Sequence, residues 1–180
     1  MMLLGGGLRV ALVTHHIAIA DVPKALSTEG ILTALRTLHA DMRRYFGLAS
    51  PRIAVAGLNP HASDGGRFGH EEERIIAPAV EQARREGIAC DGPHPPDSLF
   101  TPALRAHRDA FLAMYHDQGL IPLKMLAFGR AVNVTLGLPV VRTSVDHGTA
   151  YDIAGKGVAS TESLVEAVKL ACEIVARLKP

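Results

Sequence analysis

The sequence is poor in aromatic side chains and contains no tryptophan. Aromatic residues make up 4% of the 180 residues, which argues against a surface that stacks single-stranded nucleic acid. Positive and negative side chains nearly balance, and the formal net charge of +1 excludes strong attraction to nucleic acid or to an anionic membrane. No stretch approaches the roughly 18–20 apolar residues that span a bilayer. We therefore expect no nucleic-acid partner and no membrane.

Cysteine is equally scarce. The two cysteines, Cys90 and Cys172, do not form a CxxC pair, which favours two reduced thiols over a disulfide framework. Residues 1–7 are apolar, but they are too few for a secretory signal and lack a basic start. These features predict a cytoplasmic protein. The remaining composition, 48% hydrophobic and 21% charged, is typical of a globular protein, and the length of 180 residues predicts one domain or slightly more.

Apolar runs alternate with stretches of helical period along the whole chain. Ser27 is a good N-cap and Gly47 a good C-terminal stop for the first long helix. Strands and helices that alternate in this way predict an α/β fold, with a mainly parallel sheet and flanking helices. In such folds, ligands collect at the carboxyl ends of the strands. We predict strands at residues 8–14, 52–57, near 88, 109–115, 131–136 and 140–143, helices at 28–46, 71–86, 118–126 and about 160–178, and a loop at 91–96.

Three of the predicted strands lead into histidine-bearing segments. These contain His15 and His16, then His61, then His116. Three imidazoles with one open position are what a catalytic divalent metal requires. The alternative is that they are ordinary polar residues at strand ends, and spacing alone does not choose between His15 and His16. Four other histidines are predicted to lie on the surface: His39, His70, His94 and His107.

Further segments suggest anion and cofactor binding. The glycine-bearing loop at residues 59–66 precedes a helix, where an anion is favoured, although such a loop is often only a turn. Lys124, Arg130 and Arg142 could clamp a phosphate or carboxylate, or could be solvated cations. Two glycine turns in residues 146–157 flank an acid that could accept ribose hydroxyls. No GxGxxG follows a strand, so a Rossmann fold is not supported.

Four stretches resemble the family of 4-hydroxythreonine-4-phosphate dehydrogenase. They are LRVALVTHHIAIADV (8–22), GLNPHASDGGRFGHEE (57–72), MYHDQGLIPLK (114–124) and FGRAVNVTLGLPVVRTSVDHGTAYDIAGKG (128–157). The resemblance implies the fold of isocitrate and isopropylmalate dehydrogenases. It also implies His16, rather than His15, as a metal ligand together with His61 and His116. The substrate residues that it implies are Lys124, Asn133 and Arg142.

The resemblance also implies the cofactor and the reaction. HGTAYDIAGKG is similar to a dinucleotide-binding loop, although Tyr151 stands where the wider relatives have proline. The reaction implied is NAD-dependent oxidation of 4-phosphooxy-L-threonine at its 3-hydroxyl, followed by decarboxylation, in pyridoxal phosphate biosynthesis. NADP is the alternative cofactor, and the divalent metal is Zn, Co or Mg. Asp117 would act as an orienting residue or a proton acceptor. The cofactor residues are His147, Gly148, Thr149, Ala150 and Asp152.

The resemblance further implies a homodimer with the metal site at its interface. Family members are nearly twice as long, so the sequence reads as truncated at the amino terminus. Residues 1–130 would form a central metal-binding and dimerisation domain, and residues 131–180 part of a cofactor-binding domain. Two alternatives remain open. One is a sister dehydrogenase for 4-phospho-D-threonate or 4-phospho-D-erythronate, and the other is a catalytically silent metal-binding module.

Overall fold

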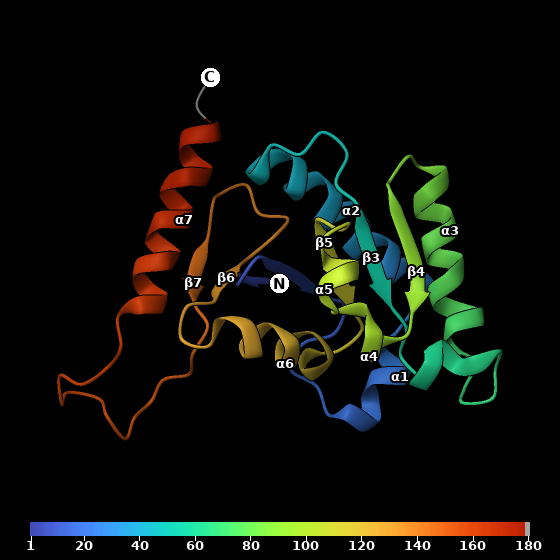
Figure 1. The fold of residues 1–180 in the computed structure, drawn as a ribbon, viewed down its shortest axis with the longest axis horizontal. Coiled ribbons are helices and arrows are strands. Elements are labelled where there is room, and N and C mark those ends of the chain that lie inside the picture. The colour runs from blue at the N-terminus through green and yellow to red at the C-terminus, as the bar shows by residue number, and fades with distance from the viewer. Residues whose placement is uncertain (179–180) are drawn as a thin grey trace.

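Residues 1–178 contain one seven-stranded sheet, with helices packed around it (Figure 1). The computed structural model describes residues 1–178. The strand order is β4-β3-β5-β2-β1-β6-β7. The strands are β1 (Met2–Gly5), β2 (Leu8–Leu12), β3 (Ile53–Ala56), β4 (Cys90–His94), β5 (Ala110–Ala113), β6 (Val132–Val134) and β7 (Thr143–Val145).

Helices pack on both faces of this sheet. Within residues 1–178, no helix has the length and apolar character needed to cross a membrane. The α-helices are α1 (Val22–Ala25), α2 (Thr28–Phe46), α3 (Ala77–Arg85), α4 (Pro96–Leu99), α5 (Pro102–Arg105), α6 (His116–Ala127) and α7 (Glu162–Leu178). The other helical segments are the 3₁₀ turns η1 (Ile19–Asp21) and η2 (Pro60–Asp64) and the π-helical η3 (Glu72–Ile76).

The sheet has a parallel part and an antiparallel part. β4, β3, β5 and β2 run parallel to one another. β1 pairs antiparallel with both β2 and β6, and β6 pairs antiparallel with β7. The carboxyl ends of β2, β3 and β5 therefore meet at one edge, as the sequence predicts. These are the three strands that precede the histidine-bearing segments.

The β1–β2 hairpin is a feature that the sequence pattern does not reveal. Gly6 and Gly7 form its two-residue turn with φ of 56° and 77°. Positive φ at both central positions is the geometry that matches the twist of a hairpin, and glycine adopts it without strain. The hairpin places β1 between β2 and β6, so it joins the parallel strands to the antiparallel ones.

The larger core lies between the sheet and the layer formed by α2, α3 and α7. In α2, apolar residues three and four positions apart are buried, and each stabilises the fold by roughly 1.5–3 kcal/mol. Ser27 caps the helix by accepting a hydrogen bond from the Gly30 N–H at 3.1 Å, and Gly47 ends it at φ 69°. Both predicted boundaries are confirmed. On the opposite face, α6 packs against β1, β2 and β5, and α4 packs against β3.

Several sequence predictions are wrong in detail. Much of the predicted loop at 91–96 belongs to β4, which lies at the sheet edge where proline is tolerated. The strand predicted at 140–143 lies instead at Thr143–Val145, because pairing with β6 sets its register. His39 and His94 are half-buried, whereas the prediction placed them on the surface.

Asp109 provides a pH-dependent tie between β3 and β5. It accepts hydrogen bonds from the Arg52 backbone N–H at 2.8 Å and from Arg52 Nε at 3.1 Å. Burial alone would raise the pKa of Asp109, but these bonds and the charge of Arg52 lower it. A lowered carboxyl pKa stabilises the fold above the unfolded value of about 4, and this stabilisation is lost as pH falls through the folded pKa.

We expect Asp109→Asn to lower the free energy of unfolding by about 1–2 kcal/mol at neutral pH. The difference from the wild-type chain should shrink as pH falls through the lowered folded pKa of Asp109, because the wild-type carboxylate is then protonated. Urea unfolding at several pH values measures it, with the exposed Asp21 changed to Asn as the control. A difference that stays constant as the pH falls from about 7 to the acid limit of the folded state would contradict this account.

Candidate functional site

His16 and His116 lie side by side where β2 and β5 end. The two strands stay paired past their last residues, because the Thr14 backbone N–H and its Oγ1 both donate to the Met114 carbonyl, at 3.1 and 2.7 Å. The ring centroids of His16 and His116 are 5.5 Å apart. Two imidazoles that bind one tetrahedral ion through bonds of about 2.0–2.1 Å have ring centres roughly 5 Å apart. The pair therefore has the spacing of two ligands of one metal.

Asp117 braces this pair. Its Oδ1 lies 2.7 Å from His116 Nδ1. A carboxylate at Nδ1 holds the proton there and leaves Nε2 free as a metal ligand, which is the usual arrangement behind ligating histidines. His116 is the first residue of α6, so the helix fixes its backbone, and Asp117 fixes its ring.

The pair lines a cavity of about 290 Å³. His15 lines the same cavity, and its Nε2 is buried without a hydrogen-bond partner among residues 1–178. Burial, followed by neighbouring positive charges, lowers the pKa of His15, which favours its neutral form. The two imidazoles, one of them held by a carboxylate, fit two of the ligand positions of a divalent cation. The rest of the lining is Ile17, Ile19, Val22, Tyr115 and Asp117.

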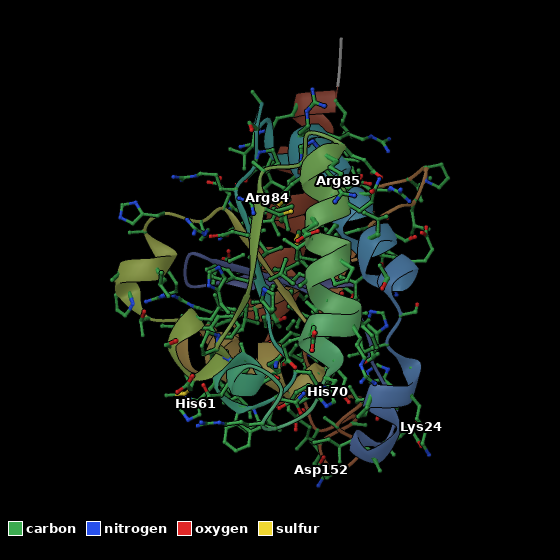
Figure 2. The ribbon with its side chains drawn as sticks, turned by 90° about the vertical axis from the view of Figure 1, so that its right-hand side faces the viewer. Lys24, His61, His70, Arg84, Arg85 and Asp152 are labelled. Carbon is green, nitrogen blue, oxygen red and sulfur yellow. The ribbon has the colours of Figure 1, made fainter. Side chains whose placement is uncertain are left out.

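His61 is not part of this group. Within residues 1–178, no three His, Cys, Asp or Glu side chains lie close enough to hold a metal ion. His61 is exposed on the 3₁₀ turn η2, with its ring 6.2 Å from that of Phe68. Figure 2 shows His61 at the same end of the molecule as Asp152, and Arg84 and Arg85 at the other. The chain thus brings together two of the three predicted ligands.

The loop that carries His61 is held by an acid. Glu72 is 4% exposed, and its Oε1 accepts hydrogen bonds from the backbone N–H groups of Leu58 and Asn59, at 2.8 and 2.7 Å. The sequence pattern suggested that the N–H groups of this loop could hold an anion. Those two N–H groups already hold the carboxylate of Glu72.

The predicted substrate residues lie on separate elements. Lys124 is on α6, and its Nζ donates to the Asp146 carbonyl at 3.4 Å and lies 3.5 Å from Asp146 Oδ1. Asn133 is on β6, and its Oδ1 is buried without a hydrogen-bond partner in the described part of the chain. Arg142 Nη1 donates to Thr135 Oγ1 at 2.8 Å. Lys124 also lines a second cavity, of about 430 Å³, together with His116 and Asp117.

The predicted cofactor segment is an exposed loop. It follows β7 and contains successive turns, with the Ile153 N–H donating to the Ala150 carbonyl at 3.1 Å. His147 Nδ1 lies 3.0 Å from the Gly148 carbonyl, and Ala150 has φ of 45°. The five predicted cofactor residues are therefore close in sequence and accessible, in a loop that closes mainly on itself.

A model of the family "Pyridoxal phosphate biosynthetic protein PdxA" matches residues 1–171. The chain belongs to the PdxA family. A 4-hydroxythreonine-4-phosphate dehydrogenase of Caulobacter vibrioides is 55% identical over 177 residues, which cover 98% of this chain and 53% of the relative. The corresponding protein of Geobacter metallireducens is 58% identical over 179 residues, which cover 99% and 52%. The chain thus spans about half the length of these PdxA relatives.

Solved structures show the same fold. A 4-hydroxythreonine-4-phosphate dehydrogenase from Klebsiella pneumoniae superimposes with a TM-score of 0.87 at 45% identity, over 96% of this chain and 53% of the other. A terephthalate 1,2-cis-dihydrodiol dehydrogenase from Burkholderia xenovorans superimposes with a TM-score of 0.78 at 35% identity, over 96% and 54%. The PdxA fold thus occurs in proteins named for different substrates.

Sequence reasoning missed the buried polar residues that support this PdxA site. Gln118 is 8% exposed, accepts from the Met114 N–H and donates to the Gly57 carbonyl, both at 2.7 Å. It therefore ties the end of β5 to the end of β3. The signal that could have marked Gln118 and Glu72 is their position just after two of the histidine-bearing segments.

Proposed function

We propose that the chain is the metal-binding portion of an NAD-dependent 4-hydroxythreonine-4-phosphate dehydrogenase. The reaction is oxidation of 4-phosphooxy-L-threonine at its 3-hydroxyl, with loss of carbon dioxide, in pyridoxal phosphate biosynthesis. The His16–His116 pair at 5.5 Å, braced by Asp117, carries this proposal. Membership of the PdxA family and the names of its relatives supply the substrate.

The residues at the carboxyl ends of β2 and β5 have distinct proposed roles. His16 and His116 hold the divalent cation, and Asp117 orients His116 rather than serving first as a proton acceptor, because its Oδ1 is engaged at 2.7 Å. When bound, Zn, Co or Mg would lower the pKa of the substrate hydroxyl and stabilise negative charge on the oxygen. His15 stays neutral beside the pair and keeps a ring nitrogen free in the cavity.

A second copy of the chain would complete the site. His61 is exposed and apart from the other two histidines, so it is free to reach a neighbouring molecule. We therefore assign His61 as the third ligand, supplied by the other chain of a homodimer. Apolar side chains beside the pair favour a covering surface: Ile121 and Met125 of α6 and Phe128 directly after it are 60%, 82% and 83% exposed.

The remaining assignments follow the family. Lys124 and Arg142 supply positive charge for the phosphate and carboxylate, and Asn133 supplies an amide. The loop from His147 to Asp152, with Gly148, Thr149 and Ala150, contacts NAD, or NADP as the alternative. NAD supplies a hydride acceptor for the oxidised carbon. We also propose the isocitrate dehydrogenase type of fold and a cytoplasmic location. We further propose two domains that divide near residue 130; Lys179 and Pro180 of the second domain lie outside the described residues.

The test is NADH formation, followed by absorbance, with the purified chain, NAD and each of the three metals. We expect turnover of 4-phosphooxy-L-threonine above that of 4-phospho-D-threonate and 4-phospho-D-erythronate. Turnover of a sugar acid alone would replace the substrate and leave the reaction class standing. His147→Ala, in the exposed loop, should raise the KM for NAD without changing metal content.

A catalytically silent metal-binding module is the second candidate. It is favoured by one observation: the loop from His147 to Asp152, which would contact the cofactor, is exposed and closes mainly on itself. This candidate predicts one divalent ion per chain and no NADH from any of the three phosphates. NADH formation with any of them excludes it.

A further inference from the structure

The loop that carries His61 has an unusual backbone. Four consecutive residues other than glycine, from His61 to Asp64, have φ of 54°, 51°, 74° and 45°. Each such residue is strained, because its Cβ crowds the backbone in the left-handed region. Strained residues persist only where the surrounding structure over-determines them, and they gather at functional sites. Something in the fold must therefore hold this loop.

Glu72 is the centre of the contacts that hold it. Its two backbone hydrogen bonds, from Leu58 and Asn59, fix the approach to the turn, and its Oε2 accepts a third from Asn59 Nδ2 at 2.9 Å. Glu71 Oε2 accepts from the same Nδ2 at 2.8 Å. Hydrogen bonds from N–H groups to a carboxylate are shorter and stronger than hydrogen bonds between neutral groups, so they hold the donors in place.

A second clamp closes the far end of the turn. Ser63 is 2% exposed, and its Oγ donates to the Gly69 carbonyl at 2.7 Å and accepts from the Gly66 N–H at 2.8 Å. The backbone on both sides of His61 is thus fixed from within. The exposed His61 ring lies 6.2 Å from the ring of Phe68, and its direction follows from the fixed backbone of the loop.

We propose that Glu72 is a positioning residue that presents His61 to the metal site of a second chain. The inference rests on the proposed function, since it takes His61 as the third ligand. Glycine at positions 61–64 would make the same turn without strain. A strained turn with side chains, held by a buried carboxylate, is instead suited to aiming one of those side chains. Glu72 therefore acts on the metal through the backbone of the loop.

The experiment is a double-mutant cycle on metal affinity. Co²⁺ alone is titrated into the full chain, and its absorption spectrum reports binding. We expect Glu72→Gln to weaken Co²⁺ binding about 10-fold, the typical loss of metal affinity when a residue that orients a metal ligand is replaced. His61→Ala should weaken it more, and Glu72→Gln combined with His61→Ala should be no weaker than His61→Ala alone. Thermal unfolding of the metal-free chains records the purely structural cost separately.

Glu73→Gln is the matched control. The Glu73 carboxylate is next in sequence but 75% exposed, and it lies 3.7 Å from His70 Nδ1. Its replacement should leave Co²⁺ affinity unchanged. If Glu72→Gln does not fold, Asn59→Ala replaces it, because this change removes the third hydrogen bond and leaves the two backbone bonds. Asn59→Ala should weaken binding about threefold, again only while His61 is present.

The outcomes separate the two proposals. If the effects of Glu72→Gln and His61→Ala add, Glu72 does not act through His61, and the positioning role is overturned while the metal site stands. If His61→Ala leaves Co²⁺ affinity unchanged, His61 is not a ligand, and both assignments fall. If Glu72→Gln lowers the unfolding temperature without changing affinity, its role is structural only, and the inference is overturned.

Discussion

Gln118→Leu is expected to lower the free energy of unfolding by about 2–5 kcal/mol. Gln118 lies at 8% exposure between β5 and β3, and its amide serves two backbone groups at once, the Met114 N–H and the Gly57 carbonyl. Leucine has nearly the same size but leaves both groups buried without a partner. An unsatisfied buried polar group costs about 1–3 kcal/mol, so the two losses add to a large effect.

Urea unfolding followed by circular dichroism measures this effect. Gln82→Leu is the control, since Gln82 donates to Glu86 at 3.0 Å on the exposed side of α3. That change should stay within about 0.5 kcal/mol. Equal stability of the two variants would contradict the bridging role of Gln118.

The sequence predicted the elements whose ends are set by local capping residues. The helix at Thr28–Phe46 was predictable because Ser27 accepts a hydrogen bond at its start and Gly47 adopts positive φ at its end. Its buried face follows from the helical period. These signals lie within one element, so the sequence alone carries them.

Other elements depend on contacts that sequence patterns do not contain. β1 is four residues long and ends in glycine, so only its pairing with β2 and β6 makes it a strand. Gly92 and Pro93 in β4 indicate a loop by composition, but one edge of β4 needs no partner. β7 is three residues long, and its position is fixed by β6. Tertiary pairing outweighs local preference in each case.

The candidate site divides in the same way. The histidines at strand ends could be identified because parallel strands bring their carboxyl ends to one edge. Which of them meet could not, because spacing in the sequence carries no distance. The structure pairs His16 with His116 and leaves His61 apart. The supports Gln118 and Glu72 were missed because a polar residue shows its burial only in the folded chain.

His116→Ala is expected to weaken the binding of Zn²⁺ or Co²⁺ by at least about 100-fold. The change removes one of two imidazoles whose centroids lie 5.5 Å apart. Replacing a residue that only hydrogen-bonds to a metal ligand already weakens metal affinity by about 10–100-fold. His16→Ala should have a similar effect. Asp117→Asn should cost about 10-fold, because an amide holds the proton at His116 Nδ1 less firmly than a carboxylate at 2.7 Å.

Titration with Co²⁺, followed by its absorption spectrum, measures these affinities. The same titration decides between the neighbouring residues His15 and His16. His15 lines the cavity, and its buried Nε2 has no partner, so on burial alone it competes with His16. The ring of His16, however, is the one beside His116. His15→Ala should therefore change Co²⁺ affinity less than about threefold, and His107→Ala, at an exposed position, should not change it. A larger loss from His15→Ala than from His16→Ala would exchange their roles. Unchanged affinity in both His16→Ala and His116→Ala would remove the metal from this edge of the sheet, and with it the chemistry proposed for the chain.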